Sequence, residues 1–125
     1  MRVTARVLAL AVALLVAACD SGPSGPGTLT AVATGNALGG VVLEVRGAGI
    51  RGFEARGDAR VYTAPVAGED GVHRVIVITP VPGELPFSIE VDDVGMEGPA
   101  VTVISAARGD NYVVPASSVT VRVER

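Results

Sequence analysis

The sequence predicts an all-β domain, an antiparallel β-sandwich of seven or eight short strands. From Leu29 onward apolar and polar residues alternate with a period of two, the pattern of half-buried strands. Clusters of Gly, Pro and Asp separate these runs at spacings of roughly 8 to 14 residues. No window after residue 28 has the apolar stripe of an amphipathic helix. A closed β-barrel is the alternative arrangement.

The first nineteen residues have a different character and are expected to be a signal-peptide helix. Arg2 and Arg6 precede an uncharged apolar run, and small residues stand just before Cys19. As a helix, the run from Val7 to Cys19 would reach only about 20 Å, against a hydrocarbon core of roughly 30 Å. An export signal is therefore favoured over a permanent membrane span.

The sequence Val16-Ala17-Ala18-Cys19 resembles the lipobox of bacterial lipoproteins. The resemblance implies that a peptidase cuts before Cys19, which then carries acyl chains such as palmitate. The membrane would be a partner through lipidated Cys19, and the protein would be exported and lipid-anchored in the cell envelope. In enteric-type lipoproteins an Asp in the place of Asp20 favours the inner membrane, but this rule varies among bacteria, so the leaflet stays open.

Residues 20–27 are rich in Gly, Pro and Ser and have no apolar periodicity, which is typical of a flexible tether. The expected organisation is a signal peptide at 1–18, the lipidated cysteine and tether at 19–27, and a sandwich domain at 28–125.

The first half of the domain contains three recognisable strand patterns. Val41, Leu43 and Val45 form one apolar face, which ends at a Gly-rich turn. Two short runs on either side of Arg56-Gly57-Asp58 predict a hairpin. The run 72–79 is apolar on both faces toward its end, which predicts a central strand.

In the second half, 80–86 is expected to be a loop because three of its seven residues are prolines. Phe87, Ile89 and Val91 should face the core. A strand at 100–107, a turn at 108–111 and a short edge strand at 112–114 follow. Val119, Val121 and Val123 mark the last strand.

Four of these segments, 41–45, 73–78, 83–91 and 119–123, resemble in order and spacing a compact cohesin-like sandwich of exported bacterial proteins. The number and spacing of the strands also fit a sandwich of immunoglobulin-like size. Cohesins bind dockerin modules through one sheet face. No binding residue carries over, so the resemblance bears on the fold.

Composition argues against several classes of function. The net charge is −3, and loss of Arg2 and Arg6 with the signal makes it more negative, so no nucleic acid partner is expected. All basic residues are Arg, which excludes catalytic lysines. Cys19 is the only cysteine and His73 the only histidine, with no triad pattern around it. We expect no enzyme, no catalytic residue, no metal site and no cofactor.

Other motifs are interpreted as turns. Glu69-Asp70 and Asp92-Asp93 with Glu97 lack the alternate spacing of a calcium loop. Arg-Gly-Asp occurs at 56–58 and 108–110, where a receptor ligand is one reading and Gly-Asp turn chemistry is the favoured one. The chain has two Tyr, two Phe and no Trp, too few aromatic residues for the platform on which glycans usually stack, so a glycan partner has little support.

The leading hypothesis is a membrane-anchored lipoprotein whose sandwich is a non-catalytic interaction or structural module with an envelope protein as partner. The alternative is a glycan- or calcium-binding module that uses the loops 47–52, 69–71 and 92–97.

Overall fold

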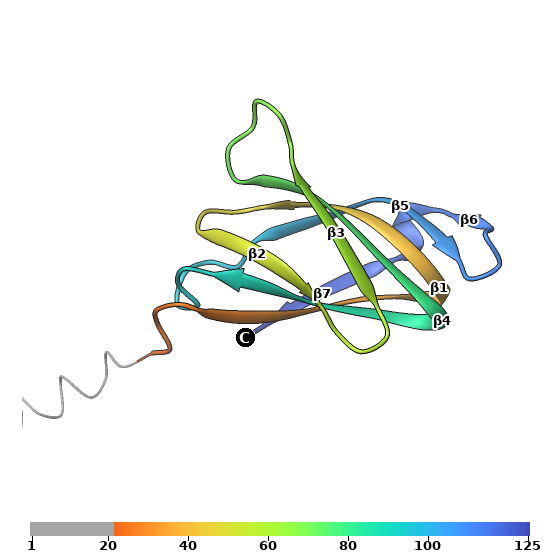
Figure 1. Ribbon diagram of the computed structural model, residues 1–125, viewed down its shortest axis with the longest axis horizontal. Coiled ribbons are helices and arrows are strands. Elements are labelled where there is room, and N and C mark those ends of the chain that lie inside the picture. Colours follow the sequence, from red (N-terminus) through yellow and green to blue (C-terminus); the bar gives the residue numbers. More distant parts are fainter. Residues whose placement is uncertain (1–21) are drawn as a thin grey trace, which may run out of the picture.

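The computed structural model describes residues 22–125 and confirms an all-β antiparallel fold with a single seven-stranded sheet (Figure 1). The predicted signal-peptide helix and Cys19 lie outside the described residues. The strands are β1 (Gly27–Arg46), β2 (Ile50–Ala55), β3 (Arg60–Pro65), β4 (Val72–Val91), β5 (Ala100–Arg108), β6 (Val113–Val114) and β7 (Thr120–Glu124), with a short 3₁₀ turn, η1 (Ala116–Ser118), before β7.

Two long strands organise the sheet. β1 and β4 each span 20 residues and pair antiparallel from Gly27 opposite Val91 to Arg46 opposite Val72. Figure 1 shows both strands reversing at the same end of the molecule, so that the sheet folds over on itself. The register is irregular there, between Ala33 and Gly40 on β1. The pairing nevertheless continues through the bend, with Leu38 opposite Gly83.

The bend divides the sheet into two layers. Layer A contains β2, residues 85–91 of β4, residues 27–34 of β1, and β7. Layer B contains β3, residues 72–78 of β4, residues 40–46 of β1, β5 and β6. The two faces that turn toward each other enclose a sandwich-like core.

The core takes alternate residues from both layers, as the period of two predicts. In layer B, Val41, Leu43 and Val45 are at most 1% exposed. In layer A, Phe87 and Ile89 are fully buried and Val91 is 5% exposed. The predicted inward faces are therefore confirmed.

Ser88 lies between these core positions but is also buried, at 4% exposure, although its alternation predicts an outward, polar position. Its register neighbours are Thr30 on β1 and Glu54 on β2. A small side chain in a central strand is covered by longer neighbours, which accounts for its burial.

The prediction of a loop at 80–86 is wrong, because β4 runs through this segment. Pro80 and Pro82 fall between the paired positions Ile78 and Gly83, where the ladder with β1 is interrupted. No backbone donor is needed at these positions, so Pro80 and Pro82 are tolerated. Pro86, the third proline, stays within the ladder, opposite Val32. The prediction of only short strands fails for the same reason: the Gly and Pro residues bend β1 and β4 without ending them.

The predicted hairpin around Arg56-Gly57-Asp58 is also wrong. β2 pairs with the second half of β4, and β3 pairs with the first half. The turn, closed by a 3.1 Å hydrogen bond from Ala59 N–H to the Arg56 carbonyl, therefore crosses from layer A to layer B. A tripeptide turn signal does not distinguish a crossing from a hairpin.

The C-terminal predictions hold. β5 and β6 form a hairpin over residues 108–112, and β6 is a two-residue edge strand. β7 pairs with the first half of β1, from Thr30 opposite Glu124 to Thr34 opposite Thr120. Val119 is 7% exposed, and Val121 and Val123 pack against the core.

Two glycines allow the β5–β6 hairpin to pack closely on the bend. Gly109 donates its N–H to the Ala37 carbonyl at 3.0 Å. A Cβ on Gly109 would lie 2.2 Å from Pro82 Cγ, and one on Gly39 would lie 2.7 Å from Gly109 Cα. Only glycine leaves room for this approach.

The N-terminal segment is attached at the opposite end of the sandwich. Gly25 donates its N–H to Asp93 Oδ1 at 3.0 Å, and Val94 donates to the Gly25 carbonyl at 2.9 Å. β1 begins at Gly27, one residue before the expected start of the domain. Within residues 22–125, no helix has the length and apolar character needed to cross a membrane.

Candidate functional site

The three loops of the glycan or calcium alternative do gather at the N-terminal end of the sandwich. Gly47 donates its N–H to the Gly71 carbonyl at 3.0 Å, and Asp92 donates to the Gly49 carbonyl at 2.8 Å. Sequence spacing alone does not place these segments together, because they follow different strands. The structure thus brings together three loops that the sequence only named separately.

Three carboxylates of these loops, those of Glu69, Asp92 and Asp93, already have partners. Asp92 lies 3.4 Å from Arg51 Nε, and Glu69 lies 3.5 Å from Arg46 Nη2. Asp93 Oδ1 accepts hydrogen bonds from the N–H groups of Gly25 and Gly95. Among residues 22–125, no group of three or more His, Cys, Asp and Glu side chains is arranged to hold a metal ion. These three carboxylates therefore serve the local structure.

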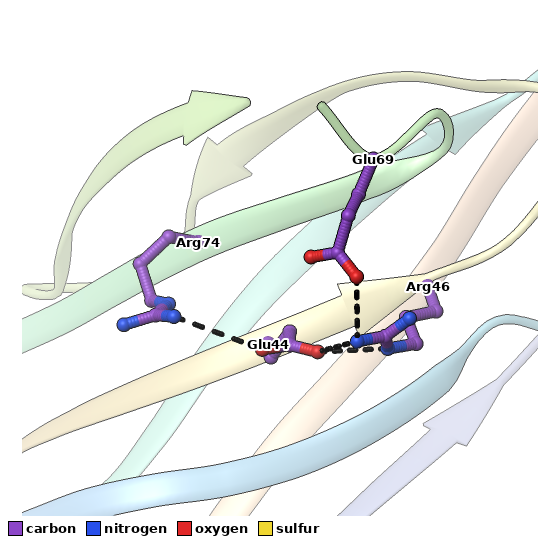
Figure 2. A network of polar contacts seen from close by, with 4 residues as sticks. All are labelled: Glu44, Arg46, Glu69 and Arg74. Atoms are coloured by element: carbon purple, nitrogen blue, oxygen red, sulfur yellow. Dashed lines mark hydrogen bonds and ion pairs between the residues drawn. The ribbon is translucent and has the colours of Figure 1, made fainter. Parts of the chain in front are cut away.

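A polar network joins this end to layer B (Figure 2). Glu44 lies between two arginines: Arg46 Nε donates to its Oε1 at 2.7 Å, and Arg74 Nη2 lies 3.7 Å from its Oε2. The hydrogen bond and charge of Glu44 raise the pKa of Arg46 above its ordinary value. Because Arg46 and Arg74 are about half exposed, the network defines charge positions on the surface more than it stabilises the fold.

His73 stands beside Phe53, with ring centroids 5.5 Å apart in an edge-to-face arrangement. Its Nδ1 is buried and has no hydrogen-bond partner within the described chain. The contact is aromatic packing at a half-buried position.

The two Arg-Gly-Asp segments lie in turns of different kinds. Arg56 Nη1 donates to Thr30 Oγ1 at 3.1 Å, which holds the first segment against β1. In the second segment Arg108 pairs with Asp110 at 2.9 Å and lies over the Tyr112 ring at 5.9 Å. Both arginines are therefore engaged within the chain.

The feature that sequence reasoning missed is the outer face of layer B. It carries large apolar side chains on four strands, with exposed fractions of 54% for Tyr62, 38% for Ile76, 39% for Ile78, 43% for Ile104 and 81% for Val113. A hollow of about 250 Å³ lies among them, lined by residues that include Gly40, Val42, Ile76, Ile78 and Ala107. In the sequence, Ile76 and Ile78 alternate with the core residues Val75 and Val77, and this alternation could have indicated an apolar outer face.

The outer face of layer A is different. Its outward positions on β1 and β4 include Thr28, Thr30 and Glu90, and β7 adds Arg122 and Glu124. Its apolar members Val32 and Pro86 are partly buried, so this mostly polar face needs no partner to cover it. The contrast makes the outer face of layer B the candidate functional site, because contiguous exposed apolar surface is typical of an interaction site.

No known family model, curated protein or solved structure matches this chain. The cohesin-like resemblance therefore stays a prediction. The case for function rests on the residues themselves.

Proposed function

We propose that this chain is an exported lipoprotein, anchored to a membrane of the cell envelope through lipidated Cys19, and that its sandwich is a non-catalytic interaction or structural module. The outer face of layer B is the observation that carries the interaction role. The lipobox-like sequence at 16–19 supports the anchor. Asp20 points to the inner membrane only by resemblance to enteric-type lipoproteins, so the leaflet stays open.

The physical argument for interaction is the cost of leaving the face in water. Ile76 and Ile78 lie side by side on one face of β4, next to Val42 and the hollow at Gly40 on β1. Each Å² of apolar surface removed from water contributes about 25 cal/mol, so covering the face favours association. The Arg and Glu side chains beside it provide orientation, since opposite charges on a partner must match them.

Covalent lipid is the anchor in this proposal because the tether at 20–27 has no apolar or basic stretch that could hold a membrane. The domain is acidic, so an anionic membrane repels it, whereas each buried acyl CH₂ contributes about 0.8 kcal/mol. A single chain anchors only marginally, and two or more hold a protein stably.

The anchor is tested with radiolabelled palmitate and the full chain in a bacterial host. The wild type and a tether control, Ser24→Ala, should take up the label and fractionate with membranes. Cys19→Ser should take up none. Absence of label in the wild type would remove the lipoprotein proposal.

The interaction role is tested by photocrosslinking in intact cells. A photoreactive residue replaces Ile76 on the outer face of layer B or, as the control, the exposed Thr120 on β7. Adducts are expected from position 76 and not from position 120. Equal labelling from both positions, or none from position 76, would contradict an interaction through this face.

The gathering of the three loops keeps calcium or glycan binding as a second candidate. It predicts a rise in the melting temperature of the full chain on calcium addition, or binding to a glycan array. The engagement of Asp92, Asp93 and Glu69 with arginines and backbone N–H groups argues for the first proposal.

A further inference from the structure

The residue pairs on the outer face of layer B are arranged in a way that indicates which partner this face binds. Along the central strands β1 and β4, three register pairs share this face: Arg74 with Glu44, Ile76 with Val42, and Ile78 with Gly40. Each pair joins two unlike members, a cation with an anion or a large side chain with a smaller one. A face of this kind is complementary to itself after a half-turn.

We propose that the outer face of layer B binds the same face of a second copy of this chain, around a two-fold axis that runs along the strands between β1 and β4. The proposal deepens the interaction function, and rests on it, by naming the partner; it does not depend on Cys19. Such an axis exchanges β1 and β4 between the copies. Each residue of a register pair then lies opposite its own pairing partner on the other chain.

The apolar half of the face fits this arrangement. Ile78 is 39% exposed and packs beside Gly40, with its Cγ2 3.3 Å from where a Cβ on Gly40 would be, and both residues line the 250 Å³ hollow. After the half-turn, Ile78 of each copy stands over Gly40 of the other. A projecting side chain thus meets a depression twice, once on each side of the axis. By the same half-turn, Ile76 of each copy lies over the smaller Val42 of the other.

The charged half fits as well. Arg74 Nη2 and Glu44 Oε2 lie 3.7 Å apart within one chain. The half-turn places Arg74 of each copy over Glu44 of the other, so four alternating charges surround the axis. An axis across the strands at Ile76 would instead place Arg74 over Ile78, a charge against an apolar side chain.

The size of the face is sufficient. Five strands about 4.8 Å apart and six residues about 3.3 Å apart give roughly 500 Å² of flat area. The accessible area is larger because the side chains project from the sheet. Specific interfaces bury about 800 Å² on each partner, and packed sheets align at about −30°. A second copy therefore covers the apolar residues with a standard sheet-on-sheet contact.

The first experiment measures the mass of the full chain by light scattering across a dilution series, in detergent, with the detergent contribution subtracted. The variants are Ile78→Arg, which places a charge in the hollow, and Met96→Glu, a control at a 54% exposed residue outside this face. Wild type and Met96→Glu should have twice the mass of Ile78→Arg. Circular dichroism checks that all three are folded.

The second experiment tests the pairing across the axis by complementation. Arg74→Glu alone places Glu over Glu, and Glu44→Arg alone places Arg over Arg, so each variant should be monomeric. Mixed together, the two chains place opposite charges at both contacts and should form a heterodimer. Loss of stability cannot be rescued in this way, so complementation remains informative even where Ile78→Arg fails to fold.

Three results would overturn the proposal. They are a wild type that is monomeric at every concentration, an unchanged mass for folded Ile78→Arg, and two charge variants that stay monomeric when mixed. Crosslinks from position 76 to a different envelope protein in a monomeric wild type would reject self-association and leave the interaction role in place. Absence of palmitate would reject the anchor alone.

Discussion

At the scale of the residue, alternation along a strand decides which side chains enter the core. Ile89 is fully buried on β4, whereas Ile76 on the same strand is 38% exposed on the outer face of layer B. Both are isoleucines in a central strand. The difference arises from the position of each residue relative to the bend and the pleat, and not from its chemistry.

Ile89→Ala should lower the free energy of unfolding by about 2 to 5 kcal/mol, because it removes buried methyl groups and leaves a cavity in layer A. Urea denaturation measures the change. Met96→Ala, at a 54% exposed position, should change stability by less than about 0.5 kcal/mol. Equal losses in the two variants would show that Ile89 is not a core residue.

At the scale of the element, the ends of strands are set by pairing rather than by local sequence. Gly35 to Gly40 and Pro80 to Pro86 carry residues that usually end strands, yet β1 and β4 continue through them. The two irregular segments lie opposite each other, so each provides the space that the other needs. Single-sequence patterns describe one segment at a time and do not contain this correspondence.

The faces of the strands and the central place of β4 could therefore be predicted, but not the bend or the crossing at Arg56-Gly57-Asp58. The same holds for the candidate site. Sequence showed that 72–79 is apolar on both sides, but the outer face of layer B combines it with Tyr62, Ile104 and Val113 from three other strands. That combination depends on strand order, which alternation does not encode.

Gly109→Ala should destabilise the fold by about 1 to 3 kcal/mol, because the added Cβ would lie 2.2 Å from Pro82 Cγ and push the β5–β6 hairpin off the bend. Thermal unfolding measures the loss. Gly98→Ala is the matched control, since nothing lies within 4 Å of a Cβ at that position. An unchanged melting temperature for Gly109→Ala would contradict the close packing.

Removal of residues 118–125 should abolish cooperative unfolding, because β7 completes layer A and carries Val121 and Val123 against the core. Val119, which the deletion also removes, is buried and contributes roughly 1.5 to 3 kcal/mol, and the partly buried Val121 and Val123 each contribute less. Removal of Arg125 alone, beyond the end of β7 at Glu124, should have no such effect. A truncated chain that unfolds like the full chain would show that β7 is dispensable.

At the scale of the whole molecule, the two layers depend on pairing between distant segments. β1 pairs with β4, β5 and β7, so the first strand finds partners along nearly the whole remaining chain. All-β proteins with such non-local pairing fold in milliseconds to seconds, since long loops must close before any contact stabilises them. Stopped-flow refolding should fall in this range; microsecond refolding would contradict the topology.

The attachment of Gly25 to Asp93 has a consequence for how two copies meet. It fixes the end of the sandwich from which the N-terminal segment departs, opposite the bend. An axis along the strands points both departing segments in the same direction, so two chains rooted in one bilayer match it, whereas chains rooted in facing bilayers do not. Confinement to a plane also aligns the copies before they touch and lowers the entropy lost on association. We therefore expect the anchored chain to dimerise in the membrane at copy numbers at which the same chain, released into free solution, would be monomeric.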